Sequence, residues 1–99
     1  MVTKGLLVRL EALPGRESEL EQFLESARSI VMSEPGTVTW FAIKMGPSTF
    51  GIFDVFPDDA ARDAHLAGGV GQALGPNTGK LFSDPVVEKL DVIASKLPV

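Results

Sequence analysis

The chain has 99 residues, a formal net charge of −4 at pH 7, one His and no Cys. This length suits a single domain with one core, and the absence of Cys excludes disulfides, thiol catalysis and thiolate metal sites. The nine Lys and Arg residues are scattered along the chain, so they form no basic stripe for binding nucleic acid. We therefore expect one domain over residues 1–99 and no nucleic-acid partner.

The N-terminal segment carries one Lys before a short apolar run, which is too short for a signal peptide or a membrane span. We accordingly expect a cytoplasmic protein with no membrane partner. One His and no dinucleotide-binding fingerprint leave little to hold a cofactor, so we also expect no flavin, haem or metal.

The first elements in chain order are a strand and a helix. Apolar residues alternate with others over residues 6–12, as in a strand with a buried face, and the Pro-Gly pair at 14–15 ends that strand. Apolar residues then recur with helical spacing from residue 16 to about residue 32. The Glu-Pro-Gly sequence at 34–36 breaks the helix, because Pro disfavours helical geometry in the residue before it.

A hairpin and a second helix follow. Strands are predicted at residues 37–45 and 50–56, and the Gly-Pro-Ser turn at 46–48 joins them. The Pro-Asp-Asp sequence at 57–59 starts a helix, since an Asp there can accept hydrogen bonds from the first free backbone amides.

Glycines interrupt this second helix. The Gly pair at 68–69 weakens or bends it, and the apolar residues of 70–74 form a second helical piece. The Gly-Pro-Asn sequence at 75–77 closes that piece, and residues 80–82 add a turn. The last strand is predicted from residue 86 to about residue 96.

The order of elements is therefore βαββαβ. Two right-handed βαβ halves of this kind interleave into an antiparallel four-stranded sheet with the helices on one face, the ferredoxin-like α+β fold. In both hairpin strands the two alternating sets of side chains are apolar, whereas a sheet wetted on one side alternates apolar with polar residues. The face away from the helices must then be covered, and a second copy of the chain is the simplest cover. We expect a homodimer through the sheet face.

Several segments together resemble the antibiotic biosynthesis monooxygenase family. They are Ala-Leu-Pro-Gly at 12–15, Glu-Pro-Gly-Thr at 34–37, Phe-Asp-Val-Phe-Pro-Asp at 53–58 and Ala-His-Leu at 64–66. The resemblance implies a dimeric α+β barrel in which two sheets pack face to face. It also implies a choice of activities, because some relatives oxidise quinols or aromatic polyketides with oxygen and no cofactor, others degrade haem, and many have no known activity.

Oxygenation without a cofactor needs a proton acceptor beside an electron-rich aromatic substrate. His65 is the first candidate catalytic base because its ordinary titration lies near neutral pH, or it is a structural His bonded to a backbone carbonyl. Asp54 is the second candidate, since burial in its apolar strand would favour its protonated form. The alternative for Asp54 is an ion pair across the sheet with Lys44 or Arg9.

The substrate-binding candidates are mostly aromatic: Trp40, Phe41, Phe53, Phe82 and, as a hydrogen-bond donor, Asn77. The alternative is that the aromatic residues are plain core or interface and that Asn77 only forms a turn. We expect the apolar cavity to lie between the sheet and the helices, roofed by the second helix and residues 68–82, whose glycines suit a mobile lid.

The chain departs from both enzyme branches of the family. The polyketide oxygenases have Asn, Trp, Tyr and Arg in the pocket, but this chain has no Tyr and its Trp40 has no match among them. The haem-degrading branch needs a His late in the second helix, where this chain has Ala-Leu-Gly at 73–75. Two functions therefore stay open: a cofactor-independent monooxygenase of small aromatics or hydroquinones, and a non-catalytic barrel that binds a small hydrophobic ligand.

Overall fold

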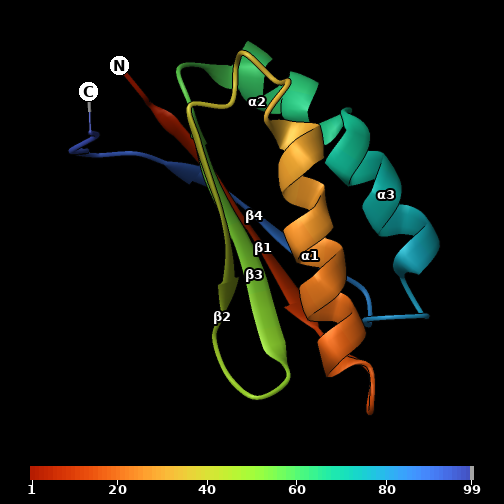
Figure 1. Cartoon of the computed structure of the whole chain (residues 1–99). Helices are drawn as coiled ribbons and strands as arrows, with labels where there is room; N and C mark the ends of the chain where they lie inside the picture. The colour runs from red at the N-terminus through yellow and green to blue at the C-terminus, as the bar shows by residue number, and fades with distance from the viewer. Residues whose placement is uncertain (99) are drawn as a thin grey trace.

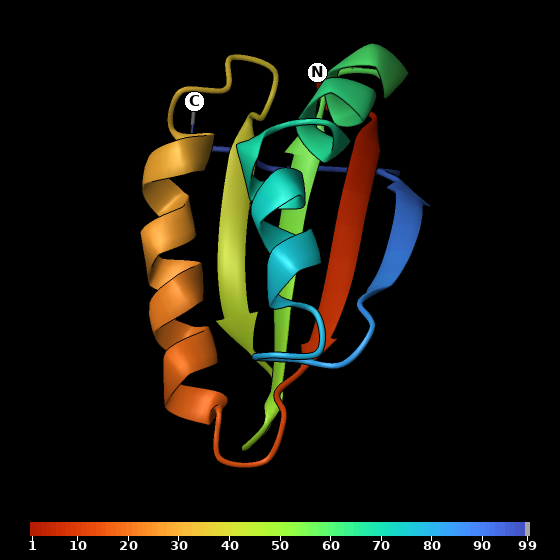
Figure 2. The ribbon, with the colours of Figure 1, turned by 90° about the vertical axis from the view of Figure 1, so that its right-hand side faces the viewer.

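The computed structural model describes residues 1–98 and has one four-stranded antiparallel sheet with helices on one of its faces (Figure 1). The elements in chain order are β1 (Lys4–Glu11), α1 (Glu17–Val31), β2 (Thr39–Lys44), β3 (Thr49–Phe56), α2 (Asp59–Leu66), α3 (Gly69–Asn77) and β4 (Val86–Asp91). The strand order is β2-β3-β1-β4. This arrangement confirms the predicted ferredoxin-like α+β fold. Figure 2 shows the helices as one layer over the sheet, with α1 beside β2 and α3 over the middle strands.

Strand register decides which side chains face the helices. Asp54 in β3 lies opposite Leu6 in β1 and opposite Trp40 in β2. Residues directly opposite one another in an antiparallel pair point to the same face. Since Leu6 belongs to the core beneath the helices, Asp54 and Trp40 also point toward the helix layer.

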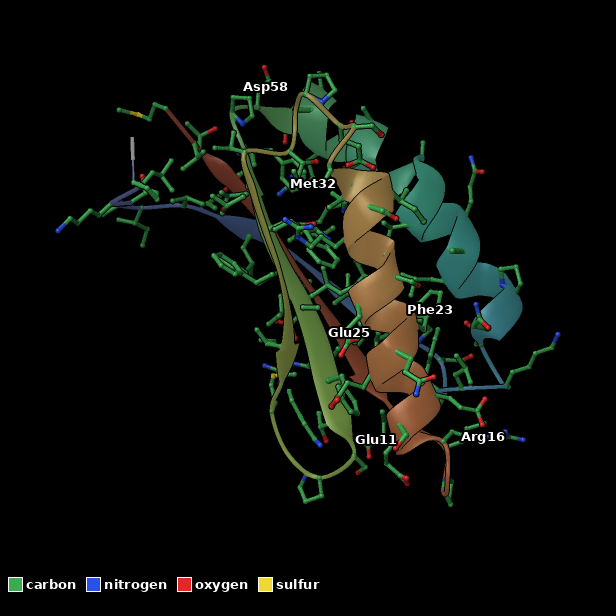
Figure 3. The ribbon with its side chains drawn as sticks, viewed as in Figure 1. Glu11, Arg16, Phe23, Glu25, Met32 and Asp58 are labelled. Atoms are coloured by element: carbon green, nitrogen blue, oxygen red, sulfur yellow. The ribbon has the colours of Figure 1, made fainter. Side chains whose placement is uncertain are left out.

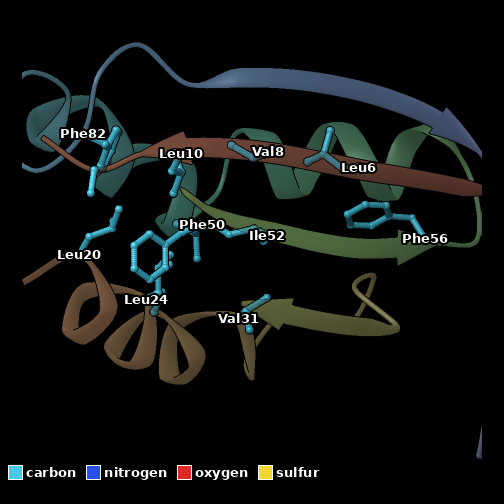
Figure 4. Close-up of a cluster of buried hydrophobic side chains, with 13 residues drawn as sticks. Leu6, Val8, Leu10, Leu20, Leu24, Val31, Phe50, Ile52, Phe56 and Phe82 are labelled. Atoms are coloured by element: carbon cyan, nitrogen blue, oxygen red, sulfur yellow. The ribbon is translucent and has the colours of Figure 1, made fainter. Parts of the chain in front are cut away.

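The core fills the space between the sheet and the helices (Figure 4). Alternate residues of β1 and β3 meet the apolar stripe of α1, which contributes Leu20, Leu24, Ala27 and Val31. Phe82 belongs to this core, is fully buried and lies 6.5 Å from Phe23, ring centre to ring centre.

The second helix is divided into α2 and α3 at the Gly pair, as predicted, but its second piece extends to Asn77 with Pro76 in its last turn. The bounds of the strands also differ from the predicted ones. β2 begins at Thr39 rather than residue 37. β4 ends at Asp91 rather than residue 96, because its neighbour β1 begins at Lys4 and offers no pairing partner beyond the bond from Val92 N to Thr3 O.

The sheet face away from the helices is apolar, as predicted. It carries Leu7, Phe41, Ile43, Phe53, Val55, Val86 and Leu90, with an ion pair between Arg9 and Glu88. The Phe41 side chain is 55% exposed and Val86 is 53% exposed. An apolar surface of this kind on a small domain is typical of an interaction face. None of the helices formed by residues 1–98 combines the length and apolarity needed to cross a membrane.

Candidate functional site

Three side chains from distant parts of the chain meet at one end of the helix layer. His65 of α2 lies between two carboxylates: its Nδ1 is 2.5 Å from Glu34 Oε1, and its Nε2 is 2.8 Å from Asp54 Oδ2. Thr37 Oγ1 donates a hydrogen bond of 2.8 Å to Glu34 Oε1. We call Glu34, His65 and Asp54 the carboxylate–histidine cluster.

Local structure places each member. Asp58 caps α2 by accepting a 2.8 Å bond from the Ala61 amide, and the helix then carries His65 inward against the Phe56 ring at 5.2 Å. Glu34 follows the end of α1, in the turn that leads into β2. Gly36 allows this turn to approach α2, because a Cβ at that position would lie 3.0 Å from the Ala61 Cβ.

Burial and charge act on the cluster together. Asp54 is fully buried, and this burial raises the pKa of its carboxyl, with the contact to His65 offsetting part of the effect. Burial works to lower the pKa of His65, but Asp54 and Glu34 together outweigh it, so the pKa of the imidazole is raised. Both groups therefore hold protons to a higher pH than they would in water.

Both ring nitrogens of His65 lie within ion-pair distance of a carboxylate oxygen, and the two carboxylates favour the protonated, imidazolium form of the ring. The Asp54 oxygen is close to Nε2 but off the direction of its N–H bond, which makes the contact an ion pair rather than a well-aligned hydrogen bond. Asp54 pairs with neither Lys44 nor Arg9, the two alternative partners predicted from the sequence. Arg9 pairs with Glu88 instead, and Lys44 pairs with Glu21.

A groove of about 720 Å³ lies between α1 and β2, next to the cluster. Its apolar wall is formed by Leu24, Val31, Trp40, Ala42 and Phe50, and Glu34 and Thr37 line it as well. Glu25 and Met32, labelled in Figure 3, are on the side of α1 that borders this groove. Ligand pockets are commonly apolar clefts of this size with a few polar groups.

The groove is not where the sequence predicted a cavity, between the sheet and the second helix with residues 68–82. Residues 68–82 do not roof it, because Val70 and Phe82 are buried in the core with Leu74 packed against it, which fills the space below α3. The wall opposite the sheet is α1 instead.

The structure brings only some of the predicted site residues together. His65 and Asp54 touch each other, and Trp40 shares their face of the sheet, but Glu34 is the member of the cluster that lines the groove. Phe41 lines the groove at the β2 edge while its side chain is exposed on the open sheet face.

The remaining candidates lie elsewhere. Phe53 points to the open face of the sheet, opposite Phe41 in the register, and Phe82 is core. Asn77 ends α3, donates a 2.9 Å bond to the Ala73 carbonyl, and borders a separate shallow pocket with Lys80.

Sequence reasoning missed Glu34. It stood in a helix-breaking triplet, and its partner His65 is 31 positions away. No local pattern marks such a pair, because the contact arises only when α2 packs beside the end of α1.

The whole chain matches the crystal structure of NE2512, a protein of unknown function from Nitrosomonas europaea. The two are 50% identical, the match covers 100% of this chain and 97% of that one, and the TM-score is 0.97. The chain belongs to the NE2512 family. No protein-family model and no curated protein matches it.

The fold of the NE2512 family also occurs in more distant structures. A candidate antibiotic biosynthesis monooxygenase from Caulobacter crescentus is 22% identical over 94% of this chain and 92% of its own, with a TM-score of 0.77. Another from Deinococcus radiodurans is 19% identical over 97% of this chain and 98% of its own, also with a TM-score of 0.77. At these identities the likeness shows a shared fold.

Proposed function

We propose that this protein is a cofactor-independent monooxygenase of the antibiotic biosynthesis type, acting on a small aromatic or hydroquinone in the groove between α1 and β2. The observation that carries the proposal is the position of Glu34, a carboxylate on the wall of an apolar groove that is linked to a buried His and Asp. The fold shared with the Caulobacter and Deinococcus proteins supports it.

In this proposal Glu34 accepts the proton of the substrate hydroxyl, with His65 and Asp54 behind it. The resulting anion gives one electron to oxygen, and the two radicals combine to form a C–O bond at the ring. Loss of water from the peroxide then turns a hydroquinone into a hydroxyquinone. One oxygen atom stays in the product, the other leaves as water, and the substrate supplies all four electrons.

The groove suits an aromatic ring. Trp40 and Phe50 offer ring faces, and Leu24 and Val31 of α1 close the opposite wall. Aromatic pairs favour offset or edge-to-face contacts, which would orient a planar substrate with its hydroxyl toward Glu34 and Thr37.

We extend the proposal to cofactor and assembly. No flavin, haem or metal is required, since the substrate is the reductant and the single His already contacts two carboxylates. The protein is proposed to be one cytoplasmic domain that forms a homodimer through the apolar sheet face.

A second candidate function is non-catalytic binding of a small hydrophobic ligand in the same groove. It is favoured by the finding that neither His65 nor Asp54 lines the groove, which leaves Glu34 as the one cluster member there.

Oxygen uptake with a panel of hydroquinones and fused-ring phenols separates the two. The monooxygenase proposal predicts turnover by the wild type and at least a tenfold lower rate for Glu34→Gln, in line with the size of general-base effects. Glu19→Gln, an exposed carboxylate of α1 paired with Arg16, is the matched control and should keep the wild-type rate. Saturable binding without oxygen uptake across the panel would leave the binding function.

A further inference from the structure

The groove between α1 and β2 is bordered by charged side chains from both of its walls. They are Glu21, Glu25 and Arg28 of α1, Glu34 beyond the end of that helix, and Lys44 of β2. Lys44 Nζ lies 3.7 Å from Glu21 Oε1, and Glu34 contacts the His65 ring. Arg28 differs from Lys44, because it forms no ion pair with a carboxylate within residues 1–98.

A partner for Arg28 is available on its own helix but is not used. Glu25 precedes Arg28 by three positions, a spacing at which helical side chains are neighbours. At the same spacing on α2, Asp59 and Arg62 form an ion pair of 3.0 Å. Glu25 and Arg28 both border the groove instead, without pairing with each other. The guanidinium of Arg28 is therefore available to an acceptor in the groove.

The end of the helix accounts for a cation at this position. Arg28 lies in the last turn of α1, where a positive charge interacts favourably with the helix dipole. A Lys would have the same effect on the dipole. Arg differs from Lys because its planar guanidinium can bind a carboxylate through two parallel hydrogen bonds. An Arg beside a groove with aromatic walls therefore suits a ligand that carries a carboxylate.

The groove is long enough for a ligand with two separate polar groups. Its α1 wall extends from Glu21 to Met32, which is about 16 Å along the helix at 1.5 Å per residue. Arg28 and Glu34 lie at different places along this wall, because Glu34 comes three residues after the last helical residue, Val31. A ligand hydroxyl at Glu34 and a second group at Arg28 therefore belong to different parts of the ligand.

We propose that Arg28 binds a carboxylate of the ligand, so that the groove selects aromatic acids with a hydroxyl at one end and a carboxylate at the other. The guanidinium donates two hydrogen bonds to the carboxylate oxygens, and the ring system packs against Trp40 and Phe50. The hydroxyl then lies toward Glu34. Arg28 determines specificity rather than rate, because the group that it contacts takes no part in the reaction.

This inference rests on the proposed function in its choice of groove, but its test measures binding and needs no turnover. The probes are 6-hydroxy-2-naphthoic acid, a rigid ring system with its two groups at opposite ends, and the methyl ester of that acid, which carries no charge. Each is titrated into the protein by isothermal titration calorimetry at neutral pH, where the acid is ionised. Wild type should bind the acid at least tenfold more tightly than the ester, in line with the strength of charge-assisted hydrogen bonds.

Arg28→Gln should lower the affinity for the acid to that for the ester and leave the affinity for the ester unchanged. Arg28→Lys keeps the charge at the helix end but not the planar group, so it should retain only part of the preference for the acid. Arg16→Gln is the matched control, because Arg16 pairs with Glu19 at the opposite end of α1 and does not border the groove. It should keep the wild-type preference. Circular dichroism of each variant checks that the fold is retained.

The inference is overturned if wild type binds neither probe or binds both equally, if Arg28→Gln retains the preference for the acid, or if Arg16→Gln loses as much of it. Where Arg28→Gln does not fold, an undiminished preference in Arg28→Lys overturns it instead. The failure of the proposed function is a separate result. A preference for the acid with no oxygen uptake would remove the monooxygenase and keep the carboxylate-binding groove, whereas oxygen uptake with uncharged hydroquinones and equal binding of the two probes would do the reverse.

Discussion

Trp40 and Asp54 lie directly opposite each other in the β2–β3 ladder, and both point toward the helix layer. The indole Nε1 of Trp40 and both carboxylate oxygens of Asp54 are buried without a well-aligned hydrogen-bond partner. It is unusual in a core this small that a buried N–H without a partner lies beside a carboxylate whose contact with its neighbour, His65, is poorly aligned. Both groups lie beside the groove and the cluster, so the residues in this part of the sheet lower the stability of the folded protein.

Replacing Trp40 by Phe should therefore cost little. The change removes the unpartnered N–H but keeps an aromatic ring, so we expect the free energy of unfolding to stay within about 1 kcal/mol of wild type. Trp40→Ala should lose about 3 kcal/mol, because it leaves a cavity between α1 and β2. Urea unfolding followed by circular dichroism measures both. A loss for Trp40→Phe as large as that for Trp40→Ala would mean that the N–H has a partner in solution.

The stability of the protein should fall as the pH rises from mildly acidic to alkaline. The pKa of Asp54 is raised from an ordinary value of 3.8 and the pKa of His65 from 6.5, so the folded state holds more protons than the unfolded state. The contribution of His65 is complete below pH 6.5 and is lost as the pH passes its raised folded pKa. The penalty from ionising Asp54 sets in above pH 3.8.

Urea unfolding at a series of pH values tests this dependence. Asp54→Asn should flatten the decline above neutral pH, since His65 then loses one of the two groups that raise its pKa. Because the chain has a single His, its ring proton resonances report the same shift by NMR without ambiguity. A His65 titration at the ordinary value in wild type would contradict the charged cluster.

The junction of α3 with α1 should not tolerate a side chain at Gly69. A Cβ there would lie 2.5 Å from Ile30 Cγ2, so Gly69→Ala is expected to destabilise the protein by about 1–3 kcal/mol despite the better helix propensity of Ala. The double variant that combines Gly69→Ala with Ile30→Ala removes the clashing methyl and should recover part of the loss. Equal stability of the single and the double variant would show that the overlap is relieved elsewhere.

A charge on the open sheet face should abolish the proposed dimer. We expect wild type to elute and scatter light as a dimer at micromolar concentration, and Phe41→Glu to be monomeric because it would bury a carboxylate in the interface. Val87→Glu is the matched control. Val87 is 50% exposed, close to the 55% of Phe41, but lies opposite Val8 and so belongs to the helix side of the sheet. A monomeric wild type would refute the dimer outright.

Local patterns in the sequence were enough to predict the order of the elements and the fold. Alternation in β1, the helical stripe of α1 and the breaks at Gly15 and Gly36 depend on residues close in the chain, whose spacing reflects the geometry of strand, helix and turn. The apolar character of both sheet faces was visible in the same way, because successive strand residues point to opposite sides.

Only the tertiary structure decided which side chains form the site. The register of β3 against β1 turned Asp54 toward the helices and Phe53 away from them, and a shift of one residue would have reversed this. The packing of α2 beside the end of α1 brought Glu34 to His65, and the filling of the core by Phe82 closed the space where the cavity was expected. These outcomes depend on contacts between residues far apart in the chain, and no period or spacing within one segment encodes such contacts.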